Sequence, residues 1–89
     1  MPTISFTRAL GRFLTVPFAK VEADTVADAF NTVFASRSTL RDYVLDDQGV
    51  LRRHIIVYVN GRPVNDRVGL SDPVGPQDEI YVFQALTGG

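Results

Sequence analysis

Few side chains in this sequence can do chemistry, and their types limit that chemistry sharply. His54 is the only histidine of the 89-residue chain, and cysteine is absent. Disulfides, thiolate metal sites and cysteine nucleophiles are therefore excluded, and a zinc site or a Ser-His-Asp triad would have to rest on one histidine. Asp46 and Asp47 could act as a paired acid and base, but a run that ends in Gln48 and Gly49 is more typical of a turn. The sequence therefore predicts a protein that is not itself an enzyme.

The charged residues give no strong signal of a ligand either. Nine basic residues stand against ten acidic ones, for a net charge of -1 and an isoelectric point near 5.6, so we expect no direct binding to nucleic acid. Arg52, Arg53 and His54 precede a predicted strand and are interpreted as its solvated end, with no catalytic role for His54. Lys20 is the only lysine, so a modifier that builds chains of itself would have one internal attachment point.

Composition and length predict a single small globular domain. Hydrophobic residues make up 45% of the chain and charged ones 21%, which is ordinary globular usage. The longest stretch without charge or turn residues is Ile55–Val59, far short of the roughly 18 apolar residues of a membrane helix. The segment Met1–Phe6 has no basic region followed by an apolar run, so no secretory signal is predicted. We therefore expect a cytoplasmic protein that does not bind membranes.

One helix is clearly predicted. Asp24 and Thr25 are good helix N-caps, and Asp28 follows in the first turn, where a carboxylate faces the positive end of the helix dipole. Apolar residues then recur at the spacing that places them on one helical stripe, up to an end near Ser36. They are Val26, Ala29, Phe30, Val33 and Phe34. Leu40, Tyr43 and Val44 allow one more short helical turn after it.

The other elements are predicted to be strands. Ile55–Val59 is rich in β-branched and aromatic residues, and Asn60-Gly61 behind it is typical of a type I′ hairpin turn. A short return strand over 62–64 should lie at an edge, because Pro63 has no amide hydrogen to donate. Further strands are expected around Ile4 and Phe6, over Val16–Ala23 and over Glu79–Phe83. The order β, β, α, β, β, β predicts an α+β fold, in which a mixed sheet of four to five strands carries one main helix on one face.

The order of elements and several short segments resemble the ubiquitin-like β-grasp sulfur carriers. The resemblance covers essentially the whole chain, and its nearest look-alikes are the small subunit of molybdopterin synthase and the thiamin (ThiS-like) and cysteine-pathway carriers. The segments that carry it are Thr25–Ala29, Asp47–Arg53, Val57–Gly61, Asp78–Ile80 and the terminal Gly88-Gly89. It implies a β-grasp domain over residues 1–84 and a flexible tail over residues 85–89 that ends in Gly-Gly.

The resemblance also implies a function. A ubiquitin-activating-type adenylating enzyme would use ATP and Mg to adenylate the carboxylate of Gly89, and a sulfur donor protein would convert it to a thiocarboxylate for a sulfur-accepting synthase. Gly88, Thr87 and Leu86 would insert into the partner. The chain would bind no cofactor itself and would be a carrier, or the small subunit of a sulfur-transfer enzyme. Because cysteine is absent, any sulfur must be carried by the carboxylate of Gly89 and not by a side-chain persulfide.

Strand parity predicts a docking surface. If Ile55, Val57 and Val59 face the helix, then alternate residues on this strand and on the last strand point to the uncovered face. These are Ile56, Tyr58, Tyr81 and Phe83. Such an apolar patch marks a protein contact in many small proteins. The alternative is cross-strand packing with no partner, worth roughly 0.2 to 1 kcal/mol per pair.

Three functions remain open. The first is the sulfur carrier, whose acceptor could belong to cofactor, cysteine, tRNA or secondary-metabolite biosynthesis. The second is a prokaryotic ubiquitin-like modifier that is conjugated to target lysines through Gly89. The third is a β-grasp interaction module in which the tail has no role.

Overall fold

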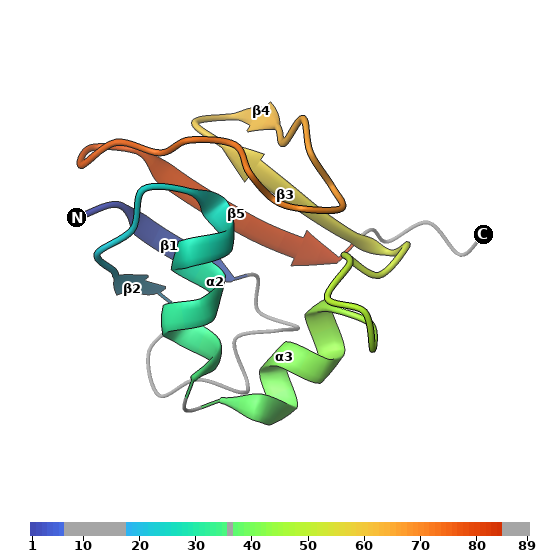
Figure 1. Cartoon of the computed structure of the whole chain (residues 1–89). Coiled ribbons are helices and arrows are strands. Elements are labelled where there is room, and N and C mark those ends of the chain that lie inside the picture. Colours follow the sequence, from blue (N-terminus) through green and yellow to red (C-terminus); the bar gives the residue numbers. More distant parts are fainter. Residues whose placement is uncertain (7–17, 36, 85–89) are drawn as a thin grey trace.

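The computed structural model describes residues 1–6, 18–35 and 37–84, and their secondary structure is that of a mixed sheet with helices on one side (Figure 1). The elements are β1 (Thr3–Phe6), β2 (Phe18–Lys20), α2 (Val26–Phe34), α3 (Ser38–Val44), β3 (Ile55–Val59), β4 (Arg62–Pro63) and β5 (Glu79–Gln84). The strands form a five-stranded sheet in the order β2-β1-β5-β3-β4. β1 and β5 are parallel and the other described pairs are antiparallel, which confirms the predicted α+β class.

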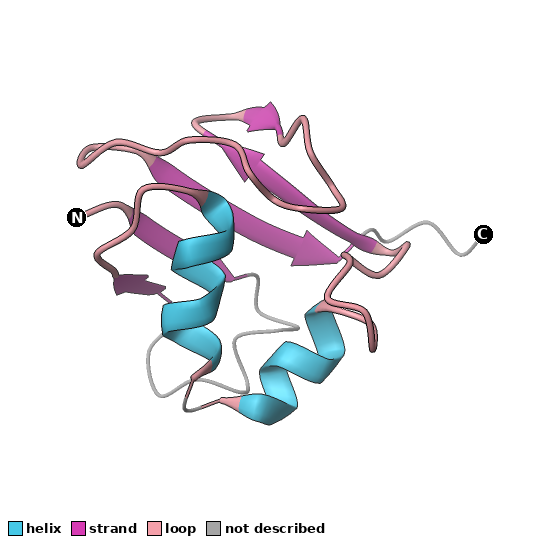
Figure 2. Cartoon of the chain, viewed as in Figure 1, coloured by secondary structure: helices cyan, strands magenta, loops and turns pink. Residues whose placement is uncertain are grey.

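Helix α2 begins where the capping residues predicted. The Thr25 hydroxyl oxygen accepts a hydrogen bond from the backbone N–H of Asp28 at 3.1 Å. The N–H groups of Val26 and Ala27 donate to carbonyls of the loop before β5, at 3.0 and 2.9 Å. The orphan donors of the first turn are thereby satisfied within the protein. The helix then lies across one face of the sheet (Figure 2).

Helix α3 is longer than the single turn that the sequence predicted. It has seven residues, and it begins only a few residues after α2 ends. Leu40 and Val44 are four residues apart, lie on one side of α3 and are fully buried in the same core as α2. Burial of this pair explains the second turn, because short helices are stabilised mainly by tertiary packing.

The hairpin after β3 has the predicted geometry. Asn60 and Gly61 both have positive φ, 53° and 82°, as a type I′ turn requires. The Asn60 side chain also fastens the hairpin to the start of β5: its oxygen accepts from the N–H of Glu79 at 2.9 Å, and its amide donates to the Asp78 carboxylate at 2.8 Å. β4 is short and forms one edge of the sheet, as Pro63 indicated. β2, predicted over Val16–Ala23, covers Phe18–Lys20 within the described part of the chain.

The core lies between the sheet and the helices, and the predicted strand parity is confirmed. Ile55, Val57, Ile80 and Val82 are fully buried on the side that faces α2, whereas Val59 is partly buried against the same core. The predicted helical stripe from Val26 to Phe34 is buried as well. No helix among the described residues is long and apolar enough to cross a membrane.

Two carboxylates organise the long loop between β4 and β5. Asp72 accepts the backbone N–H groups of Asn65 and Asp66, each at 2.9 Å. Asp66 accepts the N–H groups of Val68 and Gly69 with one oxygen and the Ser71 hydroxyl, at 2.7 Å, with the other. The Ser71 hydroxyl, together with the N–H groups of Gly69 and Ser71, lowers the pKa of Asp66 from 3.8 to about 2.

This pKa shift predicts a pH dependence of stability. The folded protein keeps Asp66 charged where the unfolded chain protonates it, so its contribution is complete above pH 3.8 and is lost as the pH falls toward about 2. We expect the free energy of unfolding to decrease over that interval, and to decrease less steeply in Asp66→Asn. Urea unfolding at a series of pH values measures both slopes. Asp47→Asn is the control, because the Asp47 carboxylate accepts no hydrogen bond among the described residues; equal slopes for Asp66→Asn and the wild type would contradict the assignment.

Candidate functional site

The four predicted docking residues form one surface on the sheet face opposite the helices. Tyr58 pairs with Tyr81 and Ile56 pairs with Phe83 across β3 and β5. The Phe83 ring lies edge-on to Tyr58, with centroids 5.2 Å apart, and tilted against Tyr81 at 5.5 Å. Tyr81 is 46% exposed, and the other three side chains are half-buried. We call these four residues the aromatic patch.

The aromatic patch lies beside the point at which the chain leaves the sheet. Phe83 is followed by Gln84, the last residue of β5, which pairs with Ile55 at the start of β3. The predicted tail residues Leu86, Thr87, Gly88 and Gly89 lie outside the described residues. Any segment that continues from Gln84 therefore starts next to the patch, and a partner that holds this segment can contact the patch at the same time.

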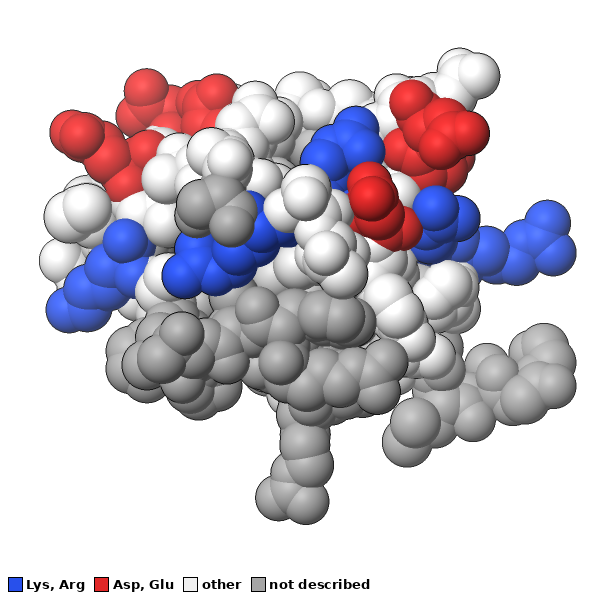
Figure 3. All heavy atoms as spheres, turned by 90° about the horizontal axis from the view of Figure 1, so that it is seen from below, with Lys and Arg blue, Asp and Glu red and all other residues white. Residues whose placement is uncertain are grey.

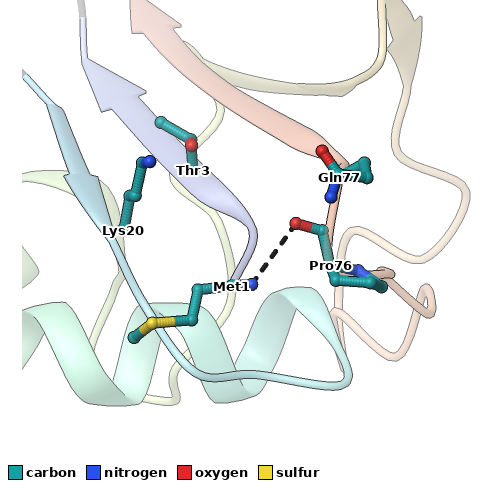
Figure 4. Close-up of a pocket in the computed structure, with 5 residues that line it drawn as sticks. All are labelled: Met1, Thr3, Lys20, Pro76 and Gln77. Carbon is teal, nitrogen blue, oxygen red and sulfur yellow. Dashed lines mark hydrogen bonds between the residues drawn. The ribbon is translucent and has the colours of Figure 1, made fainter.

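Polar residues occupy the opposite end of the same face. Thr3 pairs with Lys20 on one side and with Glu79 on the other, level with the beginning of β5. A pocket of about 320 Å³ adjoins them, lined by Met1, Thr3, Lys20, Pro76 and Gln77, and the Met1 amine donates to the Pro76 carbonyl at 3.3 Å (Figure 4). Glu79, which is level with Lys20, is five residues from Gln84 along β5, or roughly 17 Å. The sheet face opposite the helices is thus polar at one end and apolar at the end from which the chain leaves.

Packing within the sheet accounts for part of the aromatic patch. Aromatic pairs at these separations contribute about 0.5–1.5 kcal/mol beyond the area that they bury. The half-burial of Phe83 and Tyr58 fits that role. Tyr81, by contrast, is among the most exposed large apolar side chains of the described residues, so packing alone does not explain why an aromatic residue lies there. The patch therefore fits both roles that the sequence left open.

The carboxylates that could be mistaken for catalytic groups have structural roles. Asp46 accepts backbone N–H groups of Val50 and Gln48 at 3.0 and 2.8 Å, and these two bonds lower its pKa. The N–H of Gly75 and the amide of Asn60 lower the pKa of Asp78 in the same way. Asp46 thus closes the turn that the sequence predicted. Within the described part of the chain, no group of three or more His, Cys, Asp or Glu residues could hold a metal ion.

One group near the exit of β5 was not apparent from the sequence. The Arg67 guanidinium donates to the carbonyls of Arg52 and Ile55, at 3.2 and 2.8 Å, and so lies next to the start of β3. Arg67 lies in the loop between β4 and β5, and no local sequence pattern predicts the path of this loop. On the face shown in Figure 3, acidic side chains gather mainly at the upper left and upper right, and basic side chains lie below and between them.

Solved structures with the same fold are small proteins of similar length. SAMP1 from Haloferax volcanii is 25% identical, with a TM-score of 0.81, over 99% of this chain and 98% of that one. CysO in the BexX/CysO complex from Amycolatopsis orientalis is 23% identical, with a TM-score of 0.85 and full coverage of both chains. CysO from Mycobacterium tuberculosis is 21% identical, with a TM-score of 0.83, over 97% and 100%. No curated protein sequence matches the chain.

The sheet order, the helix across one face and these structural neighbours define a ubiquitin-like β-grasp protein. The sequence profile of the ThiS family matches residues 13–89. The chain therefore belongs to the ThiS family, whose members are ubiquitin-like sulfur carriers and modifiers, and the resemblance inferred from the sequence is confirmed. Members of this family are small carrier proteins and not catalysts.

Proposed function

We propose that this protein is a sulfur carrier whose reactive group is the main-chain carboxylate of Gly89. The observation that carries the proposal is the ThiS-family match over residues 13–89, which includes both terminal glycines. The side chains of the described residues support it indirectly. The three carboxylates whose pKa is lowered, those of Asp46, Asp66 and Asp78, accept backbone N–H groups and so close turns and loops. The proposal assigns the chemistry to a main-chain carboxylate, which needs no reactive side chain.

The proposed reaction has two steps. A carboxylate oxygen of Gly89 attacks the α-phosphorus of ATP on an adenylating enzyme of the ubiquitin-activating type, and pyrophosphate leaves. In the second step, the outer sulfur of a persulfide on a donor protein attacks the acyl-adenylate carbonyl, and the carbon–oxygen bond to AMP breaks. A thiol then cleaves the sulfur–sulfur bond of the resulting acyl disulfide: the thiol and the donor sulfur form a disulfide, and the thiocarboxylate of Gly89 is released. The Mg ion that accompanies ATP belongs to the partner enzyme. The thiocarboxylate finally passes its sulfur to an accepting synthase.

In this proposal the carrier positions its own reactive end and provides the surface that the partner binds. The sheet holds Phe83 and Gln84 at the exit of β5, so the patch docks while the tail enters the partner's active site. Because Gly88 and Gly89 have no Cβ, they can pass through a narrow channel and can adopt φ values that other residues do not reach. Leu86 and Thr87 would follow them into the entrance of this channel of the partner. The solved complex of the similar CysO with BexX is consistent with a carrier of this fold that acts bound to a partner.

A ubiquitin-like modifier is the second candidate. It is favoured by the likeness to SAMP1, a small archaeal modifier protein. In this case the activated Gly89 would be passed to lysines of target proteins. The chain offers one lysine of its own, Lys20, on the polar end of the uncovered face (Figure 4). A third candidate, an interaction module with an idle tail, would use the aromatic patch alone.

The products distinguish the three candidates. The protein is incubated with ATP, Mg, a sulfur donor and the adenylating enzyme of its source organism, in the presence and absence of a cell extract. A carrier gains one sulfur in place of one oxygen, whereas a modifier leaves a diglycine remnant on target lysines after digestion. A module with an idle tail undergoes neither change, and that result would contradict the proposal.

A further inference from the structure

One asparagine in the hairpin between β3 and β4 combines a reactive sequence with a specific structural role. Of the three asparagines in the chain, Asn31, Asn60 and Asn65, only Asn60 is followed by glycine. The backbone nitrogen of the next residue can attack the side-chain amide carbon of an asparagine, and glycine hinders this attack least because it has no side chain. Asn60 and Gly61 are both exposed to water. Asn60 is therefore the asparagine of this chain that is most prone to lose ammonia.

The folded protein engages both polar atoms of the Asn60 side chain. Its oxygen accepts from the N–H of Glu79 at 2.9 Å, and its amide donates to the Asp78 carboxylate at 2.8 Å. The backbone N–H of Asn60 also donates to the Glu79 carbonyl at 2.9 Å. We call these three hydrogen bonds the Asn60 latch, because they fasten the hairpin to the beginning of β5, beside which it lies (Figure 1).

The conformation of the turn opposes the reaction as well. Asn60 and Gly61 have φ of 53° and 82°, as in a left-handed type I′ turn. In that conformation the nitrogen of Gly61 points away from the Asn60 Cβ across the Cα–C bond, so a five-membered ring between them cannot close. The ring can close only after the turn opens and the Asn60 latch breaks. Local openings of this kind occur in folded proteins, most readily in exposed loops.

We propose that Asn60 is a site of spontaneous modification whose reaction makes an opening of this hairpin permanent. In the open hairpin, the Gly61 nitrogen attacks the side-chain carbonyl carbon of Asn60. The new carbon–nitrogen bond closes a succinimide, and the side-chain nitrogen leaves as ammonia. Water then adds to one of the two ring carbonyls and breaks its bond to the Gly61 nitrogen, which leaves an aspartate or an isoaspartate at position 60. The reaction needs no reactant other than water.

The product cannot form the Asn60 latch again. A carboxylate at position 60 has no N–H to donate, and it would face the Asp78 carboxylate where the Asn60 amide now donates at 2.8 Å. Two carboxylates this close repel one another unless one of them is protonated. Asp78 also accepts the N–H of Gly75 with its carboxylate, at 2.7 Å, and the N–H of Thr3 with its backbone carbonyl, at 3.0 Å. Repulsion at Asp78 therefore loosens the point at which the hairpin and β1 meet the beginning of β5.

Peptide mass spectrometry after prolonged incubation at mildly alkaline pH measures the modification directly. Asn60 is expected to react at least about tenfold faster in the urea-unfolded chain than in the folded protein, a factor that corresponds to the two side-chain hydrogen bonds of the latch. Asn65 is the internal reference, because it is exposed and its side chain makes no hydrogen bond to the described residues, but it precedes Asp66. Equal rates for Asn60 in the two states, or a faster reaction at Asn65, would overturn the inference.

A pair of variants tests whether the Asn60 latch controls the rate. Asp78→Ala removes the acceptor of the Asn60 amide and should accelerate the reaction of Asn60 in the folded protein. Asp66→Ala is the matched control, because the Asp66 carboxylate closes a neighbouring loop without contact to the latch. The two variants are compared at urea concentrations that give them the same free energy of unfolding, so that only local opening differs. Equal rates would show that global unfolding controls the reaction, which contradicts the role of the latch.

Asn60→Asp carries one of the two products and tests the consequence of the reaction. Asn60→Gly is its control, because glycine keeps the positive φ without strain but has no side chain. We expect a lower melting temperature for Asn60→Asp than for Asn60→Gly at neutral pH. The difference should disappear as the pH falls through the carboxyl range, where a proton on either carboxylate restores a donor. Equal melting temperatures at neutral pH would overturn the permanent opening. No measurement here involves Gly89 or an adenylating enzyme, so the results decide the inference independently of the proposed function.

Discussion

Deletion of Gly89 is expected to abolish ATP-dependent adenylation of this protein. The new terminal carboxylate, on Gly88, would lie one residue short of the α-phosphate, a displacement of about 3.5 Å in an extended chain. A misplacement of only 1 Å can cost roughly a hundredfold in rate, so we expect a loss of at least that size. ATP–pyrophosphate exchange with the adenylating enzyme measures the effect.

A binding measurement distinguishes the loss of the reactive carboxylate from a loss of affinity for the adenylating enzyme. The aromatic patch is unchanged in the deletion variant, so its dissociation constant for the adenylating enzyme should stay within a fewfold of the wild-type value. Pyrophosphate exchange at the wild-type rate after removal of Gly89 would contradict the assignment of the reactive group. Loss of binding together with exchange would show that the tail contributes affinity as well as the reacting atom.

Phe83→Asp is expected to give the second large effect, through docking. The substitution places a carboxylate in the centre of the aromatic patch, next to Tyr58 and Tyr81. Central aromatic residues of protein interfaces are worth about 2–4 kcal/mol, or roughly 30-fold to 1,000-fold in the dissociation constant. We expect weaker binding to the adenylating enzyme by such a factor and a parallel decrease in adenylation at limiting enzyme.

Two further variants make this result interpretable. Thr3→Asp adds the same charge to the same face of the sheet at its polar end, and should leave binding unchanged. Phe83→Leu keeps an apolar side chain at the site and should retain most of the affinity. The ring lies outside the core that α2 covers, so Phe83→Asp should fold, which its melting temperature verifies. Unchanged adenylation kinetics in a folded Phe83→Asp variant would remove the aromatic patch from the interface.

Local patterns were sufficient to predict most of the fold. The stripe from Val26 to Phe34, the cap at Thr25 and the turn at Asn60-Gly61 each depend on neighbours within a few residues in the sequence. The alternation of buried and outward residues along β3 and β5 follows from the same kind of pattern. The composition of the aromatic patch could therefore be predicted before its geometry was known.

The features that the sequence left undetermined depend on contacts between distant segments. The length of α3 is set by burial of Leu40 and Val44 in a core built by other elements. The loop before β5 is held by the backbone carbonyls of Leu70 and Asp72, which accept the N–H groups of Ala27 and Val26 at the start of α2. The Arg67 guanidinium is held at the start of β3 by the carbonyls of Arg52 and Ile55, twelve or more positions away. No local pattern contains this information.

The direct test of the central claim is the mass and fragmentation of the intact protein after reaction with ATP, the adenylating enzyme and a sulfur donor. Because the chain contains no cysteine, a persulfide on a side-chain thiol cannot give the same signal. We predict one oxygen-for-sulfur exchange, confined to the C-terminal fragment that contains Gly89 and absent when ATP is omitted. Sulfur located on any other residue, or an unchanged mass after the adenylate has formed, would contradict the assignment of this protein as a thiocarboxylate carrier.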